Sequence, residues 1–219
     1  MRQTDAVDLP ADSRPDDVVW PHAQWPPPHE LRGQHVTLTQ FTPADGDGLF
    51  AALDHDPCWE HVAGRPASAE DYTTTLADAP AAGRWPWVVR LIAPVGDADA
   101  GTVVGTTSFL DVSLSDARLE IGSTAYAPAV WATVVNPEAK LLLMTWAFDH
   151  GFGRVQMKTD IRNRRSQRAI AGTGATYEGV LRRYQRRSDG TVRDTVMFSV
   201  TAEEWPAVRE RLRARLMTA

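Results

Sequence analysis

The feature that most constrains the fold is a long apolar helix between two strand-like segments. Residues 118–126 and 155–161 have the composition of strands, and residues 137–150 between them are apolar on nearly all sides. A strand, a helix and a strand in this order form a crossover, which makes the two strands parallel if they are neighbours in one sheet. The helix is then expected to be buried against that sheet.

Further segments alternate between strand and helix patterns. Thr42-Pro43 and Ser68-Ala69 carry the capping residues that open helices. The expected strands are 36–41, 85–92, 103–112, 176–186 and 192–200, and the expected helices are 43–53, 68–79, 164–172 and 201–216. Consecutive strands joined by short turns pair antiparallel. The order predicts an α/β (α+β) protein with a mixed, mostly antiparallel central sheet flanked by helices.

The chain divides into an arm and one domain. Residues 1–30 are rich in Asp and Pro and are expected to form a mobile or extended arm, whereas residues 31–219 have the pattern of a single folded domain. Trp20 and Trp25 are unusual in such an arm. They favour docking of the arm on the domain or on a second subunit, so a homodimer is one expectation.

Composition and charge narrow the class of protein. The single cysteine, Cys58, excludes an intrachain disulfide and a Cys-based metal site, and His55 and His61 have no convincing partner ligands, so no metal is expected. We expect a cytoplasmic protein without membrane contact, because neither a signal sequence nor a long apolar run is visible. The net charge is −5, with 16 acids and 6 bases in residues 1–100 but 4 acids and 11 bases in residues 151–194. This asymmetry predicts either two solvated faces or a polyanionic ligand near the basic segment and a cationic substrate near the acidic one.

Residues 119–208 carry two motifs that point to a family. The first is Asn-x-x-Ser-x-x-x-Ile at Asn163, Ser166 and Ile170, and the second is Glu-Gly-x-Leu-Arg at 178–182. The segment resembles the branch of GCN5-related N-acetyltransferases (GNAT enzymes) that includes the bacterial ribosomal-protein N-terminal acetyltransferases of the RimJ/RimL type. The resemblance implies the GNAT fold, in which a parallel pair of strands is splayed, and acetyl-CoA as co-substrate.

The resemblance also implies a donor site. Pantetheine is expected to pair with the strand at 119–127, and the pyrophosphate to rest on N–H groups at the start of the long helix. The usual loop, Gln/Arg-x-x-Gly-x-Gly/Ala, is altered here, with Trp131, Val134 and Asn136 at its defined positions. The alternative is that Asn136 caps the helix, Pro137 is its first residue and Lys140 is a solvated charge. The predicted donor-site residues are Ile121, Gly122, Ser123, Thr133, Val134, Val135, Lys140, Asn163 and Arg168.

Acyl transfer to an amine needs a base for the ammonium proton and a proton for the departing thiolate. Glu120 is the candidate base and Ser166 the candidate donor, with a paired carboxylate and a helix cap as their alternative roles. The family attacks directly, so Cys58 is not needed as a nucleophile. Tyr177 and Tyr184 are alternative hydroxyls. The acceptor is expected near Asp56, Trp59, Trp85 and Trp131, although core packing is the more common role for any one such side chain.

The predicted function is transfer of an acetyl group from acetyl-CoA to the primary amine of a protein N-terminus or a small molecule. Three alternatives remain open: a GNAT enzyme using a longer acyl-CoA or an aminoacyl-tRNA, a non-catalytic CoA-binding module, and a nucleic-acid binder. The acidic net charge argues against the last, so no nucleic acid is expected as a partner.

Overall fold

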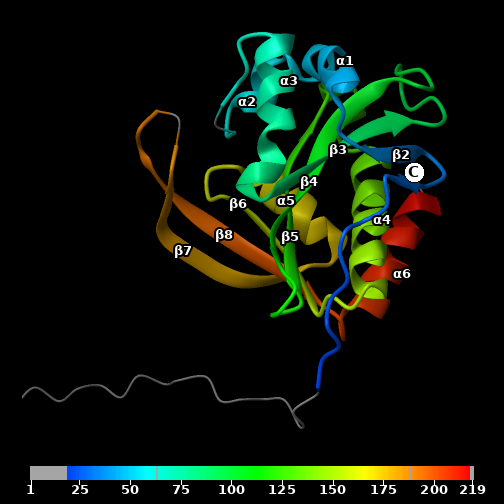
Figure 1. Cartoon of the computed structure of the whole chain (residues 1–219), viewed down its shortest axis with the longest axis vertical. Helices are drawn as coiled ribbons and strands as arrows, with labels where there is room; N and C mark the ends of the chain where they lie inside the picture. The colour runs from blue at the N-terminus through cyan, green and yellow to red at the C-terminus, as the bar shows by residue number, and fades with distance from the viewer. Residues whose placement is uncertain (1–18, 63, 188, 218–219) are drawn as a thin grey trace, which may run out of the picture.

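The computed structural model describes residues 19–62, 64–187 and 189–217. An eight-stranded sheet in the order β1-β2-β3-β4-β5-β6-β8-β7 forms its centre (Figure 1). Its strands are β1 (Glu30–Arg32), β2 (Val36–Gln40), β3 (Arg84–Leu91), β4 (Val103–Ser113), β5 (Arg118–Tyr126), β6 (Arg154–Asp160), β7 (Thr176–Arg186) and β8 (Val192–Thr201). The helices are α1 (Gly46–Leu53), α2 (Asp56–Trp59), α3 (Ala69–Ala77), α4 (Val135–Asp149), α5 (Arg164–Thr173) and α6 (Trp205–Met217).

The sheet is antiparallel except between β5 and β6, which confirms the predicted mixed sheet and its parallel pair. The parallel pair is short. Its rungs are Arg118↔Arg154, Leu119↔Val155 and Glu120↔Gln156. β5 then continues to Tyr126 and β6 to Asp160 without pairing, so the two strands diverge.

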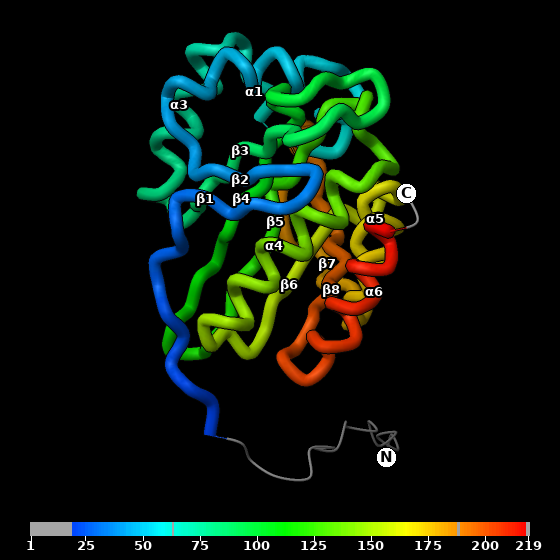
Figure 2. Tube along the Cα trace, turned by 90° about the vertical axis from the view of Figure 1, so that its right-hand side faces the viewer, coloured from blue at the N-terminus to red at the C-terminus, as the bar shows by residue number. Residues whose placement is uncertain are grey.

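Two apolar clusters hold the helices to the sheet. The larger joins the sheet to α4, α5 and α6, and the smaller joins it to α1, α2 and α3. The views in Figures 1 and 2 show α4 and α6 on one flank of the sheet and α1 and α3 at one end. Leu143, Met144 and Ala147 of α4 are completely buried, as the apolar composition of this helix predicts.

A buried carboxylate on α4 ties the helix to the start of the domain. Glu138 is 2% exposed, and it accepts the backbone N–H groups of Gln34, His35 and Val36 at 2.8, 2.7 and 2.7 Å. A Cβ at Gly33 would lie 2.5 Å from the carboxyl carbon of Glu138. The turn between β1 and β2 therefore wraps around this carboxylate, and glycine leaves room for it.

Lys140 is a second buried polar group on α4. Its ammonium lies against the sheet, where it donates to Thr124 Oγ1 at 2.8 Å and to Thr107 Oγ1 at 3.3 Å. Burial lowers the pKa of Lys140 from 10.5 to about 7. The alternative of a solvated charge at this position is therefore wrong, because the side chain is 4% exposed.

The described part of the N-terminal arm docks on the domain. The Trp25 ring lies 4.8 Å from that of Trp85 and 5.7 Å from that of Trp146, centroid to centroid, and Trp20 Nε1 donates to Gly151 O at 2.8 Å. Figure 2 shows the arm running up the side of the molecule to β1. Docking on the domain, one of the two expectations for these tryptophans, is confirmed, while residues 1–18 lie outside the described part of the chain.

The structure adds short elements that the sequence did not predict, and it moves the starts of the long helix and of the last helix. The sequence did not predict β1 or α2, each of which has four residues or fewer. The last helix begins at Trp205 rather than Thr201, because Glu204 Oε2 accepts the N–H of Thr201 and forms a turn there. Among the described residues, no helix is long and apolar enough to cross a bilayer.

Replacing Glu138 by Gln is expected to destabilise the fold by about 3 kcal/mol, because one acceptor oxygen becomes a donor that faces backbone N–H groups. Urea denaturation measures the loss. Glu210→Gln, on an exposed residue of α6, is the matched control. Equal stability of the two variants would show that the Glu138 contacts contribute nothing.

Lys140→Met is expected to change how stability depends on pH. The folded pKa of Lys140 is depressed, so between about pH 7 and 10.5 the unfolded chain holds a proton that the folded chain lacks. Lys140 therefore makes wild-type stability rise with pH in this window by about 1.4 kcal/mol per pH unit. The advantage of the Met variant over wild type should be largest near pH 7 and shrink towards pH 9.

Urea denaturation of both proteins from pH 6.5 to 9.5 checks this expectation, with Arg213→Met on exposed α6 as the control. A difference between wild type and Lys140→Met that stays constant over the series would mean that Lys140 does not lose its proton in the folded state.

Candidate functional site

The divergence of β5 from β6 coincides with a bulge. β5 pairs with β4 through Ser108↔Gly122 and Thr106↔Ala125, so one extra residue lies on β5. Ser123 in this stretch has a left-handed φ of 46°. A bulge bends its strand and increases the local twist. Beyond Glu120, the edge of β5 that faces β6 therefore has backbone groups that the sheet does not pair.

Glu120 lies at the last rung of the parallel pair, where the strands begin to part. It is 3% exposed, and its Oε2 lies 2.7 Å from Nζ of Lys158 on β6. Lys158 Nζ also lies 3.3 Å from Oδ2 of Asp111, a residue of β4 with a left-handed φ of 49°. The ring of Tyr184 covers the same ammonium, 5.6 Å from its centroid. Two carboxylates and one ammonium thus meet at the divergence.

Burial dominates the electrostatics of this cluster. Burial raises the pKa of the Glu120 carboxyl; Lys158 opposes this shift and Asp111 adds to it. Burial alone would lower the pKa of Lys158, but the bond to Glu120 and the attraction of Asp111 raise it overall. The lysine therefore stays an ammonium, and the glutamate is a carboxylate held closer to protonation than an exposed one.

The start of α4 opens towards the same gap. The helix begins at Val135 with Val134 as its N-cap, and no side chain caps it. Thr133 Oγ1 donates to Val130 O at 2.7 Å, which holds the loop ahead of the helix. Asn136 and Pro137 lie inside the first turn, so the alternative in which Asn136 caps the helix is wrong. First-turn N–H groups have no partner within the helix and attract anions.

The start of α5 lies across from this loop. Asn163 caps α5, because its Oδ1 accepts the N–H of Ser166 at 2.9 Å. Arg165 stacks on Trp131, 3.7 Å from the ring centroid, and donates to Pro57 O at 2.9 Å. Arg168 is exposed. The structure therefore brings Asn163, Ser166 and Trp131 to one region.

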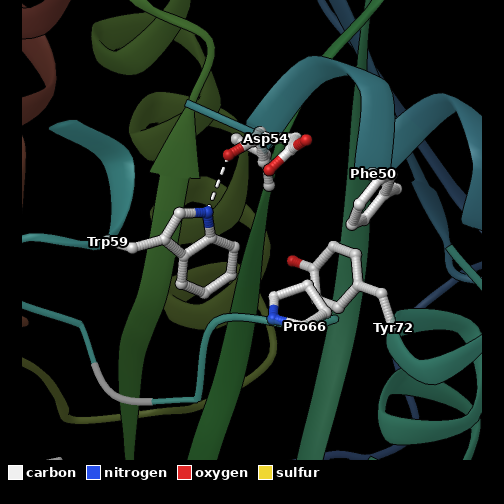
Figure 3. A pocket seen from close by; sticks show the side chains of 6 residues that line it. Phe50, Asp54, Trp59, Pro66 and Tyr72 are labelled. Atoms are coloured by element: carbon white, nitrogen blue, oxygen red, sulfur yellow. Dashed lines mark hydrogen bonds between the residues drawn. The ribbon is translucent and has the colours of Figure 1, made fainter. Parts of the chain in front are cut away.

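The residues predicted for the acceptor are more scattered. Asp56 is exposed and binds Arg65, which also binds Asp54. Trp59 donates through Nε1 to Leu53 O at 2.7 Å and lines a shallow niche with Phe50, Pro66 and Tyr72 (Figure 3). Trp85 lies on the α4 side of the sheet against Trp25, so the structure does not bring it together with Trp59.

The residues predicted for the donor site on β5 and α4 also lie in different places. Gly122 lies beside Glu120, since a Cβ at Gly122 would be 2.6 Å from Glu120 Oε1. Ile121 is buried in the larger cluster, and Lys140 is the buried amine described above. Ser123, Thr133, Val134 and Val135 lie at the bulge and at the start of α4.

Sequence reasoning missed Lys158 and Asp111. Lys158 could have been found, because residues on one face of a strand alternate and Lys158 is two residues after Gln156, the partner of Glu120. Asp111 could not, because its position depends on an irregularity in the pairing of β4 with β5. Tyr184, considered only as a hydroxyl, lies against Lys158.

Comparisons with known proteins agree with this geometry. Residues 35–176 match the family model described as an acetyltransferase (GNAT) domain. A GCN5-related N-acetyltransferase from Brucella melitensis is 26% identical, with a TM-score of 0.81 over 90% of this chain and 89% of that one. A structure from T. thermophilus that is described as an acetyltransferase is 34% identical, with a TM-score of 0.77 over 88% of this chain and 100% of that one.

RimJ from Mycobacterium smegmatis, solved in complex with CoA-disulfide, is 22% identical, with a TM-score of 0.67 over 84% of this chain and 92% of that one. A search of curated proteins found no match. The family match covers well over half of the chain, and it confirms the resemblance seen in the motifs. The chain belongs to the GNAT acetyltransferase family.

Proposed function

We propose that this protein transfers an acetyl group from acetyl-CoA to a primary amine, on a protein N-terminus or a small molecule, by direct attack of the amine. The observation that carries the proposal is the unpaired edge of β5 that begins at a buried carboxylate. This arrangement combines a backbone surface for an extended ligand with a base at one end of it.

The residues around the gap fit the chemistry of acetyl-CoA. The edge of β5 from Gly122 to Ala125, which β6 does not pair, offers backbone partners to the amides of the pantetheine arm. The uncapped first turn of α4 suits a pyrophosphate, and exposed Arg168 suits a further phosphate. RimJ of the same fold was solved with a CoA-disulfide, which supports a coenzyme A ligand. When bound, acetyl-CoA supplies an activated acyl thioester.

Glu120 is the proposed base. An amine attacks only in its neutral form, so a carboxylate must take the ammonium proton, and the proton then rests on Glu120. Burial raises the pKa of Glu120 and so makes it a stronger base than an exposed glutamate. Lys158 keeps that carboxyl from becoming permanently protonated.

Ser166 is proposed to pass a proton to the departing thiolate, and its hydroxyl regains the proton that the attacking nitrogen loses as the amide forms. Its backbone N–H is fixed by Asn163, which sets the position of the side chain at the start of α5. In residues 19–62, 64–187 and 189–217, no hydrogen bond occupies the Ser166 hydroxyl. That hydroxyl is therefore available for a ligand or a bridging water.

Calorimetric titration of acetyl-CoA into the protein is expected to show one saturable site per chain, and amines added to the complex should release CoA thiol. Glu120→Gln should retain acetyl-CoA binding but lose about 100-fold in kcat/KM, because only the base is removed. Glu210→Gln is the charge-matched control on α6. Absence of acetyl-CoA binding at low and high salt would refute the proposed function.

Lys158→Met is expected to move the acidic limb of the kcat/KM pH profile upwards. The ammonium favours the charged form of Glu120, so its loss raises the pKa of the base further, and the base is then protonated up to a higher pH. Lys158→Arg keeps the positive charge and should keep the limb near its wild-type position. If wild type, Lys158→Met and Lys158→Arg have the same pH profile, Lys158 does not influence the pKa of the catalytic base.

A further inference from the structure

A second hollow lies on the same face of the sheet as the proposed base. It encloses about 210 Å³ between the loop after α2, the end of β6 and the tip of the β7–β8 hairpin. Figure 1 shows this hairpin projecting from the edge of the sheet and rising towards α2. We call this hollow the hairpin cleft; its lining includes His61, Arg162, Arg186, Arg187 and Arg193.

The hairpin cleft carries a small net positive charge. Its lining holds four arginines, against Glu60, Asp160 and Asp189. Asp160 is already neutralised, because Arg187 binds both of its oxygens, at 2.5 and 2.9 Å. Arg162 and Arg186 are exposed at the rim. The cleft therefore attracts an anion.

Among the arginines that line the hairpin cleft, Arg193 would gain most from a bound anion. It is partly buried, and its Nε donates to Thr195 Oγ1 at 3.0 Å. Across the part of the chain that the structure describes, no carboxylate forms an ion pair with it. Burial lowers the pKa of Arg193, while Asp160 and Glu120 oppose this shift. A partly buried guanidinium without a counter-ion is costly unless a bound anion completes it.

The strand register connects Arg193 to the chemistry. Thr195 on β8 is opposite Asp160 on β6, and Lys158 is two residues before Asp160. Alternate residues of a strand share a face, so Arg193, Asp160 and Lys158 line the same face of the sheet. A molecule with its amine at Glu120 would therefore extend towards Arg193.

Asp56, which was expected to attract a cationic acceptor, does not form an open site. It shares Arg65 with the neighbouring Asp54, at 2.6 and 2.7 Å. Their charge is already balanced in part by this shared arginine. The hairpin cleft, on the same face of the sheet as Glu120, is lined mainly by arginines.

We propose that the acceptor carries an anionic group, a carboxylate or a phosphate, close to its amine, and that Arg193 binds this group with help from Arg162 and Arg186. The inference rests on the proposed function for the placement of the amine. The cleft is smaller than the roughly 300–1,000 Å³ of sites that enclose drug-sized ligands, so it fits the charged end of an acceptor. The acceptor is either a small acidic amine or a peptide with acidic residues after its N-terminus.

Matched acceptors test the proposal through the release of CoA thiol. The small-molecule pairs are β-alanine with its amide and phosphoethanolamine with ethanolamine; the peptide pair differs only by Asp and Glu in place of Asn and Gln. Wild type is expected to prefer the acidic member of at least one pair by 10-fold or more in kcat/KM. Comparing the small-molecule pairs with the peptide pair shows whether the acceptor's anionic group belongs to a small molecule or to a peptide.

Arg193→Gln should abolish this preference while changing kcat/KM for the neutral member less than about 2-fold, because charge-assisted hydrogen bonds to the anion are lost. Arg193→Lys should retain part of the preference. Arg213→Gln, an exposed arginine of α6 with the same change in charge, should behave as wild type. Equal use of acidic and neutral acceptors by wild type would overturn the proposal.

Binding of the N-acetylated acidic peptide, which cannot react, separates this inference from the proposed function. If wild type binds it and Arg193→Gln binds it at least 10-fold more weakly, the anion site stands even if no amine is acetylated. If wild type does not bind it and shows no acid preference, the site is refuted. If Arg193→Gln weakens acetyl-CoA and leaves acceptor preference unchanged, the cleft serves the donor and the proposal is wrong.

Discussion

The rest of the site depends on the early separation of β5 from β6. Two parallel strands that paired along their whole length would satisfy each other and leave no room for a ligand. Here pairing stops at Glu120↔Gln156, and a bulge at Ser123 turns β5 away. α4 follows β5 and α5 follows β6, so both helices begin where the strands part. The early end of the β5–β6 pairing thus brings together an unpaired strand edge, the starts of two helices and the buried carboxylate of Glu120.

The two lysines of the chain show opposite solutions to the burial of an amine. Among the residues that the structure describes, Lys140 has only threonine hydroxyls for partners, so the cost of burying charge favours its neutral form. Lys158 has Glu120 and Asp111 within reach and remains an ammonium. The first lysine belongs to the core and the second to the site, and the presence of carboxylates decides which state each adopts.

Much of the fold could be predicted, because it follows from the spacing of apolar residues and from the order of strands and helices along the chain. The apolar helix between two strands required a parallel pair, and the short turns required antiparallel neighbours. The position of Lys140 was also visible in principle, because it shares a helical stripe with Leu143, Met144 and Ala147, all of which are buried. The sequence did not show on which side of the sheet Trp85 lies. Alternation of side chains shows that a strand has two faces, but it does not show which helices cover each face. The site was harder still, since Asp111 and Arg193 reach it through a bulge and a hairpin tip.

The docked arm has a consequence for where this domain ends. The family match begins at residue 35 and stops at 176. A fragment cut at those limits would lack Trp25, whose ring fills the space between Trp85, Phe109 and Trp146. It would also lack β8, the neighbour of β6, and α6, which covers part of the larger core cluster. The stretch that the family model matches is therefore smaller than the packed domain, and the parts that complete its core lie outside that match.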